Sequence, residues 1–323
     1  MLSKLDLKAS LEGLVVIRDD RLPVRRIPLR EKPLQRYVLP YRGLLGLLII
    51  LIAWSLSWVQ DGGVGENNTF FPLWLGFILM IDGLVLRRTG SSLLVRSPKI
   101  VALMFVAATP YWWTFEGINQ VTQNWIYIGP DNRTLFDYLS ASLSFSVVIP
   151  AVFELSELIG SFSFIRRFSR MPVLVLSQAQ IKIVAILGVL SLAALLLWPT
   201  YLFPITWLCL FLIFDPINHL AGRPSILSQV RNGDWRLVVA FALGALVCGF
   251  FWEMWNNTTS VSWKYDFAYF DFARVFQMPI LGYGGYLPFG LETYAVFHFI
   301  AGLLGWSSNS HVPLNGDAQA LSA

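Results

Sequence analysis

Eight stretches of mostly apolar residues, each close to the length of a membrane-spanning helix, dominate this sequence. A helix needs about 20 such residues to cross the hydrocarbon core of a bilayer. Of the 323 residues, 55% are hydrophobic and only 14% are charged, whereas soluble proteins carry about 25% charged residues. The sequence therefore predicts an all-α, polytopic membrane helix bundle of eight transmembrane helices. The predicted spans are 43–59, 70–86, 100–116, 138–159, 181–199, 202–218, 236–255 and 279–305.

Basic residues are distributed unevenly among the connections. If eight spans alternate in direction, 21 Lys and Arg residues fall on one side, and only Arg133, Lys264 and Arg274 fall on the other. Because Lys and Arg accumulate in cytoplasmic loops, we expect an integral protein of the cytoplasmic (inner) membrane with both termini in the cytoplasm. On this topology, 1–42 is a basic cytoplasmic arm, 161–180 a cytoplasmic linker and 306–323 a flexible cytoplasmic tail.

The two halves of the chain carry similar polar and aromatic residues in the same order, separated by 137 or 138 positions. Such a regular offset indicates an internal repeat. Each half then contains four helices, in membrane repeat 1 over 43–160 and membrane repeat 2 over 181–305, and an even number of helices gives both repeats the same orientation. The matched pairs are Glu116 with Glu253, Asn119 with Asn256, Trp125 with Trp263, Tyr127 with Tyr265, Pro150 with Pro288, and Glu154 with Glu292.

Carboxylates within the predicted spans are the strongest indication of function. A charge at the centre of a membrane costs about 2.5–3.5 kcal/mol on insertion scales, so these acids are expected to face the interior of the bundle. The amides of Asn119 and Asn256 lie one turn from a Glu and are expected to donate to it or to hold it protonated. The alternative is that these residues are polar clamps between helices. The candidate catalytic residues are Glu116, Glu253, Glu154, Glu292, Asn119 and Asn256.

Aromatic residues supply the candidate binding surface. Trp125, Tyr127, Trp263 and Tyr265 fall in the outer connections, where an interfacial aromatic belt is one interpretation. The other is that they fold inward as the wall of an apolar pocket. The candidate substrate-binding residues are Trp125, Tyr127, Trp252, Trp263, Tyr265 and Tyr286.

The remaining polar residues and the two cysteines are expected to have structural roles. Asp82 and Asp215 lie near cytoplasmic helix ends, where each is expected to cap the loop that follows. His298 is expected to be a buried core histidine, and Cys209 and Cys248 to be packing residues. The sequence contains no motif for a metal, a nucleotide or a redox cofactor, so no cofactor is expected.

The second half resembles the repeat unit of the small integral-membrane lycopene cyclases. The resemblance lies in Asn256, the Trp263-Lys-Tyr265 element, and the run Ile280-Leu-Gly-Tyr-Gly-Gly-Tyr-Leu-Pro288-Phe-Gly-Leu-Glu292. In that family two adjacent acids follow the proline two and three residues on, whereas here a single Glu follows four residues on. The resemblance implies two tandem membrane units and cyclisation of a carotenoid or related isoprenoid.

Three functions are compatible with this pattern. The first is a redox-neutral isoprenoid cyclase or isomerase, in which a neutral carboxylic acid protonates an alkene and aromatic faces stabilise the cation. Its partners are membrane lipid and a hydrophobic isoprenoid-like small molecule, with no nucleic acid. The second is a transporter or proton-coupled carrier that uses the paired Glu and Asn residues. The third is a non-catalytic membrane protein of structural role.

Overall fold

The computed structural model is mostly helical, as the sequence predicts. It describes residues 39–59, 69–128, 134–258, 262–269, 271–306 and 309–316. Nearly all of the expected basic arm over 1–42, and the end of the expected tail, lie outside these ranges.

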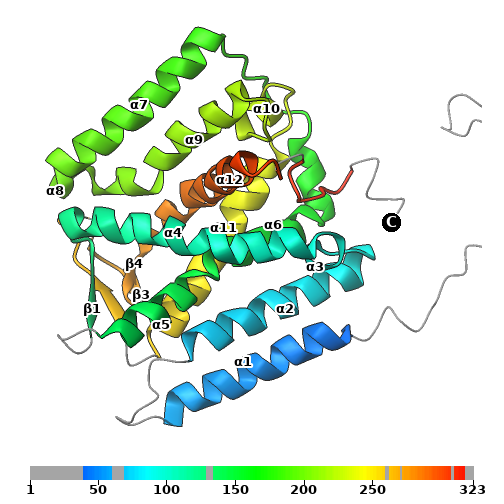
Figure 1. Ribbon diagram of the computed structural model, residues 1–323, viewed down its shortest axis with the longest axis vertical. Helices are drawn as coiled ribbons and strands as arrows, with labels where there is room; N and C mark the ends of the chain where they lie inside the picture. The colour runs from blue at the N-terminus through cyan, green and yellow to red at the C-terminus, as the bar shows by residue number, and fades with distance from the viewer. Residues whose placement is uncertain are drawn as a thin grey trace, which may run out of the picture. The chain divides into compact units, whose positions relative to one another are not determined.

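The described residues of the first half form six helices, a short strand and a 3-10 turn (Figure 1). A Pro at the first helical position, Pro98, begins α4, and a capping box between Thr134 and Asp137 begins α5; both are common N-terminal signals. The elements are α1 (Tyr41–Val59), α2 (Phe70–Thr89), α3 (Leu93–Arg96), α4 (Pro98–Thr122), β1 (Trp125–Ile128), α5 (Leu135–Phe145), α6 (Val148–Gly160) and η2 (Ser163–Phe168).

The second half has a similar order of long helices, with more irregular structure before the last one. The elements are α7 (Gln178–Leu197), α8 (Pro199–Leu202), η3 (Phe203–Trp207), α9 (Cys209–Leu220), α10 (Ile226–Val230), α11 (Arg236–Asn256), β2 (Ser262–Tyr265), β3 (Arg274–Val275), β4 (Met278–Pro279), η4 (Ile280–Gly285) and α12 (Tyr286–Leu303).

Five helical segments in the described part of the chain are long and apolar enough to cross a membrane, and a bent pair makes a sixth. The five are Tyr41–Trp58, Phe70–Thr89, Leu135–Gly160, Gln178–Leu197 and Arg236–Asn256. The outward faces of α1 and α7 expose aliphatic side chains such as Leu51, Ile52, Ile186 and Leu190. Exposed apolar faces of this extent suit contact with lipid. These are the features of an integral membrane protein.

Three predicted spans differ from the helices observed. The stretch 138–159 falls within one segment that could cross a membrane, Leu135–Gly160, but a turn at Ser146 and Val147 divides this segment into α5 and α6. The stretch 202–218 bends by 42° at Leu208, between the segment Pro199–Trp207 and α9. The stretch 279–305 starts as β4 and η4, and its helix begins only at Tyr286, because three glycines within 280–285 disfavour helix.

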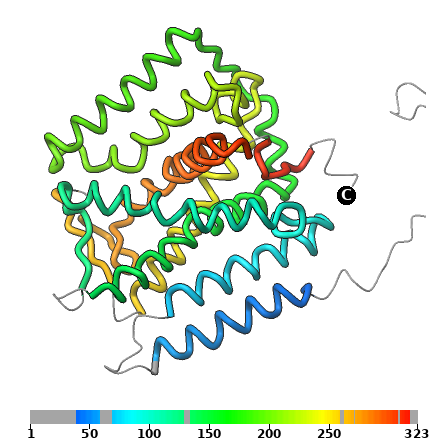
Figure 2. Tube along the Cα trace, in the orientation of Figure 1, coloured from blue at the N-terminus to red at the C-terminus, as the bar shows by residue number. Residues whose placement is uncertain are grey.

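The long helices pack in a consistent order from one edge of the described bundle to the other. Helix α1 packs on α2, α2 on α6, α6 on α11, α11 on α12, α12 on α9, and α9 on α7. In Figure 2 the blue trace of α1 and the green trace of α7 lie at opposite edges of the bundle. A Cβ on Gly46 would lie 2.5 Å from the carbonyl oxygen of Gly76. Glycine is therefore what allows α1 and α2 to approach so closely, as small residues do in membrane helix pairs.

Asp82 and Asp215 cap the short helices that follow them, which confirms the prediction. Asp82 accepts a hydrogen bond from the backbone N–H of Leu94 at 3.1 Å and also pairs with Arg42 at 3.0 Å. Asp215 accepts from the backbone N–H groups of Ile226 and Leu227 at 2.7 and 3.0 Å. Each aspartate fixes the start of a short helix against the end of a long one.

Residues 309–316 pack against the bundle, although the sequence gives no sign of it. Val312 and Leu314 are buried. Asn315 donates from its backbone to the carbonyl of Gly160 and from its side chain to that of Ser161, each at 2.8 Å. His311 stacks on His298, with 5.6 Å between ring centroids. His298 is fully buried, as expected. The segment joins the end of α6 to α12.

Candidate functional site

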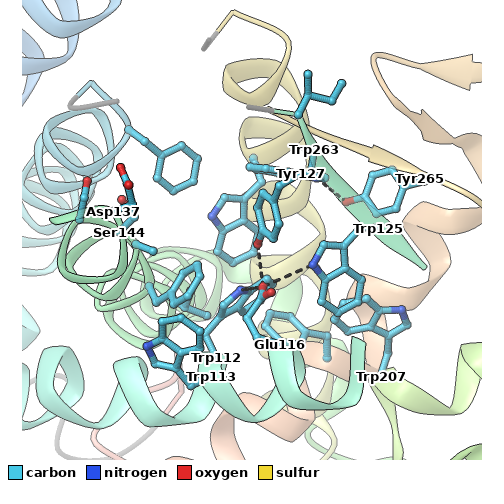
Figure 3. Close-up of a pocket in the computed structure, with 18 of the residues that line it drawn as sticks. Trp112, Trp113, Glu116, Trp125, Tyr127, Asp137, Ser144, Trp207, Trp263 and Tyr265 are labelled. Carbon is cyan, nitrogen blue, oxygen red and sulfur yellow. Dashed lines mark hydrogen bonds between the residues drawn. The ribbon is translucent and has the colours of Figure 1, made fainter. Parts of the chain in front are cut away.

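A cavity of about 340 Å³ lies where α4, β1, α5, α11, β2 and the start of α12 meet. Its volume falls within the range typical of small-molecule sites. Twelve of its lining side chains are aromatic, and Glu116 and Asp137 contribute carboxylates (Figure 3). The lining residues are Phe70, Trp112, Trp113, Glu116, Trp125, Tyr127, Ile128, Asp137, Ser140, Ala141, Ser144, Phe145, Val148, Trp207, Trp252, Trp263, Tyr265, Tyr286 and Phe289.

Glu116 is held within the cavity wall by three aromatic donors. Its Oε1 accepts hydrogen bonds from Tyr127 Oη at 2.6 Å, Trp112 Nε1 at 3.0 Å and Trp125 Nε1 at 3.3 Å. Figure 3 shows these rings gathered around the carboxylate. Because charge-assisted hydrogen bonds are stronger than neutral ones, the arrangement orients the three rings as well as the acid.

Glu253 occupies a similar position in the second half, but it does not line the cavity; it bonds to two side chains that do. Its Oε1 accepts from Tyr265 Oη at 2.6 Å and from Tyr286 Oη at 2.9 Å. Trp263 Nε1 in turn donates to Tyr265 Oη at 2.8 Å. The other oxygen, Oε2, is buried and has no hydrogen-bond partner among the described residues. Hydrogen bonds from two tyrosine hydroxyls therefore connect Glu253 to the cavity wall.

Burial keeps the hydroxyl groups of Tyr127 in β1 and Tyr265 in β2 protonated. It raises the pKa of Tyr127 and of Tyr265 well above the usual value. The charge of the neighbouring glutamate, Glu116 or Glu253, raises each pKa further. Since a higher phenol pKa favours the protonated form, both hydroxyls remain able to donate.

Asn119 and Asn256 hold the two strands in place. The side chain of Asn119 donates to the carbonyl of Trp125 at 2.8 Å and accepts from its N–H at 3.2 Å. The side chain of Asn256 makes the same two bonds with Trp263, both at 2.8 Å. The sequence led us to expect bonds from these amides to the glutamates, whereas the bonds recorded fix the backbone of a tryptophan.

The strands β1 and β2 pair with each other and bring the two halves together. They run antiparallel, with Trp125 opposite Tyr265 and Tyr127 opposite Trp263. Of the two interpretations of these aromatic residues, the structure has the inward one, since all four line the cavity.

The predicted site residues fall into two groups. All six candidate substrate-binding aromatics and Glu116 line the cavity, and Glu253 is bonded to two of those aromatics. Glu154 and Glu292 are buried in α6 and α12 but do not line it. Glu292 Oε1 accepts from the backbone N–H of Leu210 at 2.8 Å, whereas both carboxyl oxygens of Glu154 lack a hydrogen-bond partner among the described residues.

Sequence reasoning missed one wall of the cavity. Helix α5 contributes Asp137, Ser140 and Ser144 to the lining, together with Ala141 and Phe145. These residues recur at three- and four-residue intervals, so they share one helix face. This spacing of polar residues, within a predicted span rich in serine, could have indicated that one face of the helix lines a cavity.

Within the described ranges, no group of three or more His, Cys, Asp or Glu side chains is placed to hold a metal ion. Cys209 and Cys248 are buried free thiols. No family model, curated protein or solved structure matches the chain.

Proposed function

We propose that this chain is a membrane enzyme that cyclises or isomerises an isoprenoid-like lipid by acid–base chemistry in the aromatic cavity. The observation that carries the proposal is one cavity in which a carboxylate, Glu116, lies among aromatic faces while a second, Glu253, is one hydroxyl away. Alkene cyclisation needs a proton donor, a surface that stabilises a carbocation, and a proton acceptor.

Each component has a candidate residue. Glu253, once protonated, supplies a proton through Tyr265 or Tyr286. It donates to the phenol oxygen, which reverses the hydrogen bond of the resting site, and the tyrosine gives its own proton to an alkene carbon and takes the one from Glu253. The cation lies over the faces of Trp252, Trp125 and their neighbours. Glu116 then removes a proton from an adjacent carbon, which restores a double bond. One proton is added to the substrate and one is removed, so the product is an isomer and no oxidant is needed.

The architecture that we propose with this function is two tandem four-helix repeats with eight spans. Helices α4 and α12, of 25 and 18 residues, would be the two spans beyond the six candidates. Both termini would lie on the cytoplasmic side of the inner membrane. Reporter fusions at the C-terminus and near Gly129 should then give opposite readings, and readings on the same side would contradict eight spans.

The reaction is tested by lipid analysis of cells that express the protein together with an isoprenoid pathway. Wild type should convert an acyclic isoprenoid into an isomer of equal mass, and Glu116→Gln should lower conversion by about 10²–10⁴-fold, the usual contribution of general acid–base catalysis. Asp271→Asn, which removes an exposed carboxylate outside the cavity, is the matched control. If Glu116→Gln and Glu253→Gln both retain wild-type conversion, the carboxylates are structural. Ion-dependent uptake by vesicles without conversion would instead support a carrier.

A further inference from the structure

Most of the aromatic donor groups of the cavity wall are already bonded within the protein. Trp112, Trp125 and Tyr127 donate to Glu116, and Tyr265 and Tyr286 donate to Glu253. The indole N–H of Trp263 goes to Tyr265, and that of Trp113 goes to Ser142. Seven of the twelve aromatic lining residues therefore have their polar hydrogen bonded within the protein. The N–H and O–H groups of these seven rings already have acceptors, so the rings can contact a ligand mainly through their faces.

The charge of the wall has one sign. Glu116 and Asp137 line the cavity, whereas none of the described lining residues is Lys, Arg or His. In Figure 3 Asp137 lies across the cavity from Trp125, so the carboxylates stand on different sides. A wall with carboxylates and few free donors repels anions. It also offers an uncharged polar ligand few hydrogen-bond donors.

Aromatic faces and carboxylates both attract positive charge. Ring faces carry the negative end of the aromatic quadrupole, and aromatic cages are the usual sites for quaternary ammonium groups. A hydrogen bond from an indole N–H or a phenol O–H to a carboxylate moves electron density toward the ring, which strengthens the attraction at its face. Glu116 therefore acts on a cation directly and through the rings that it holds, whereas Glu253 acts through Tyr265 and Tyr286.

We propose that the cavity is a binding site for an organic cation of the trimethylalkylammonium class. Binding of the cation can be measured without any reaction, so this proposal is tested separately from the proposed enzymatic activity. The same chemistry occurs in a free ligand such as choline and in the headgroup of phosphatidylcholine.

The decisive comparison uses two ligands of the same shape. Choline has a positively charged nitrogen at the position where 3,3-dimethylbutan-1-ol has a neutral carbon. With the protein in phosphatidylglycerol nanodiscs, labelled choline is measured by equilibrium dialysis and the alcohol by competition. Choline should bind about tenfold or more tightly, since a desolvated cation–π contact is worth a decade or more in affinity. Equal affinity of the two ligands for the wild-type protein would overturn the proposal.

A variant localises the effect to the cavity. Glu116→Gln keeps the shape of the side chain but removes its charge, so choline binding should weaken about tenfold while that of the alcohol stays the same. Asp271→Asn removes one charge outside the cavity and should leave choline binding unchanged. If Asp271→Asn weakens choline as much as Glu116→Gln does, the attraction is a general surface effect and the site is not in the cavity. Should Glu116→Gln fail to fold, the two-ligand comparison on wild type still decides.

The lipid composition identifies the source of the cation. If the headgroup of phosphatidylcholine enters the cavity, nanodiscs of that lipid should bind much less labelled choline than phosphatidylglycerol nanodiscs. If binding is equal in the two lipids, the ligand is a free cation.

Discussion

The first and second halves of the site build the same local arrangement but give it different access to the cavity. In both, an Asn fixes the backbone of a Trp, and the Tyr two residues later donates to a Glu at 2.6 Å. Glu116 lines the cavity, whereas Glu253 lies behind Tyr265 and Tyr286. Two similar polar clusters can therefore have unequal roles when one touches the ligand and the other acts through a hydroxyl.

The largest expected difference between the halves is in the tyrosines. Under the proposed reaction Tyr265 carries the proton of Glu253, so Tyr265→Phe should lower lipid conversion by about 10²-fold or more. Tyr127 only orients Glu116, which keeps its two indole donors, so Tyr127→Phe should lower conversion about tenfold. Initial rates of isomer formation measure both. Equal losses would contradict the division of roles, and a small loss in Tyr265→Phe would assign the proton transfer to Tyr286.

The asparagines should behave alike. Asn119→Ala and Asn256→Ala each leave a tryptophan backbone N–H and C=O without their side-chain partner. Each should destabilise the protein by about 1–3 kcal/mol, the cost of leaving a buried polar group unsatisfied. Thermal unfolding in detergent followed by tryptophan fluorescence gives the comparison. A large loss in one variant alone would show that β1 and β2 do not depend equally on their clamps.

The second pair of glutamates should respond in opposite directions to leucine. Glu154→Leu replaces a buried carboxyl group that has no hydrogen-bond partner among the described residues, so stability should be unchanged or higher by about 1 kcal/mol. Glu292→Leu removes the acceptor of the Leu210 N–H and should cost about 1–3 kcal/mol. Unfolding temperatures report the sign. A strongly destabilising Glu154→Leu would mean that this carboxyl group has a bonded role.

The smallest difference concerns the capping aspartates. Asp82→Asn and Asp215→Asn should each cost about 1 kcal/mol, because an amide can replace only one of the two acceptor oxygens. Arg42, which pairs with Asp82, is mostly buried and Asp82 fully so, and salt screens such pairs much less than exposed ones. The cost of either substitution, measured by thermal unfolding, should therefore change little at high salt.

The sequence predicted the helical class and seven of the residues that line the cavity, since apolar length and matched spacing are local properties of a chain. It correctly predicted caps at Asp82 and Asp215, where an acid lies just before a loop. It did not predict the pairing of β1 with β2, because strands this short are fixed by contacts between distant segments. It also placed Glu154 and Glu292 with Glu116, since spacing along the chain does not reveal which side of a helix faces the cavity.

The contacts of Asn315 set a constraint on how the molecule is assembled. Gly160 and Ser161, to which Asn315 donates, belong to the first half, and Arg236, which donates to the Asn315 carbonyl at 3.1 Å, begins α11. A ribosome completes both of those regions long before it reaches Asn315. The end of α6 and the start of α11 therefore lack this link until residues 309–316 have been synthesised and pack between them.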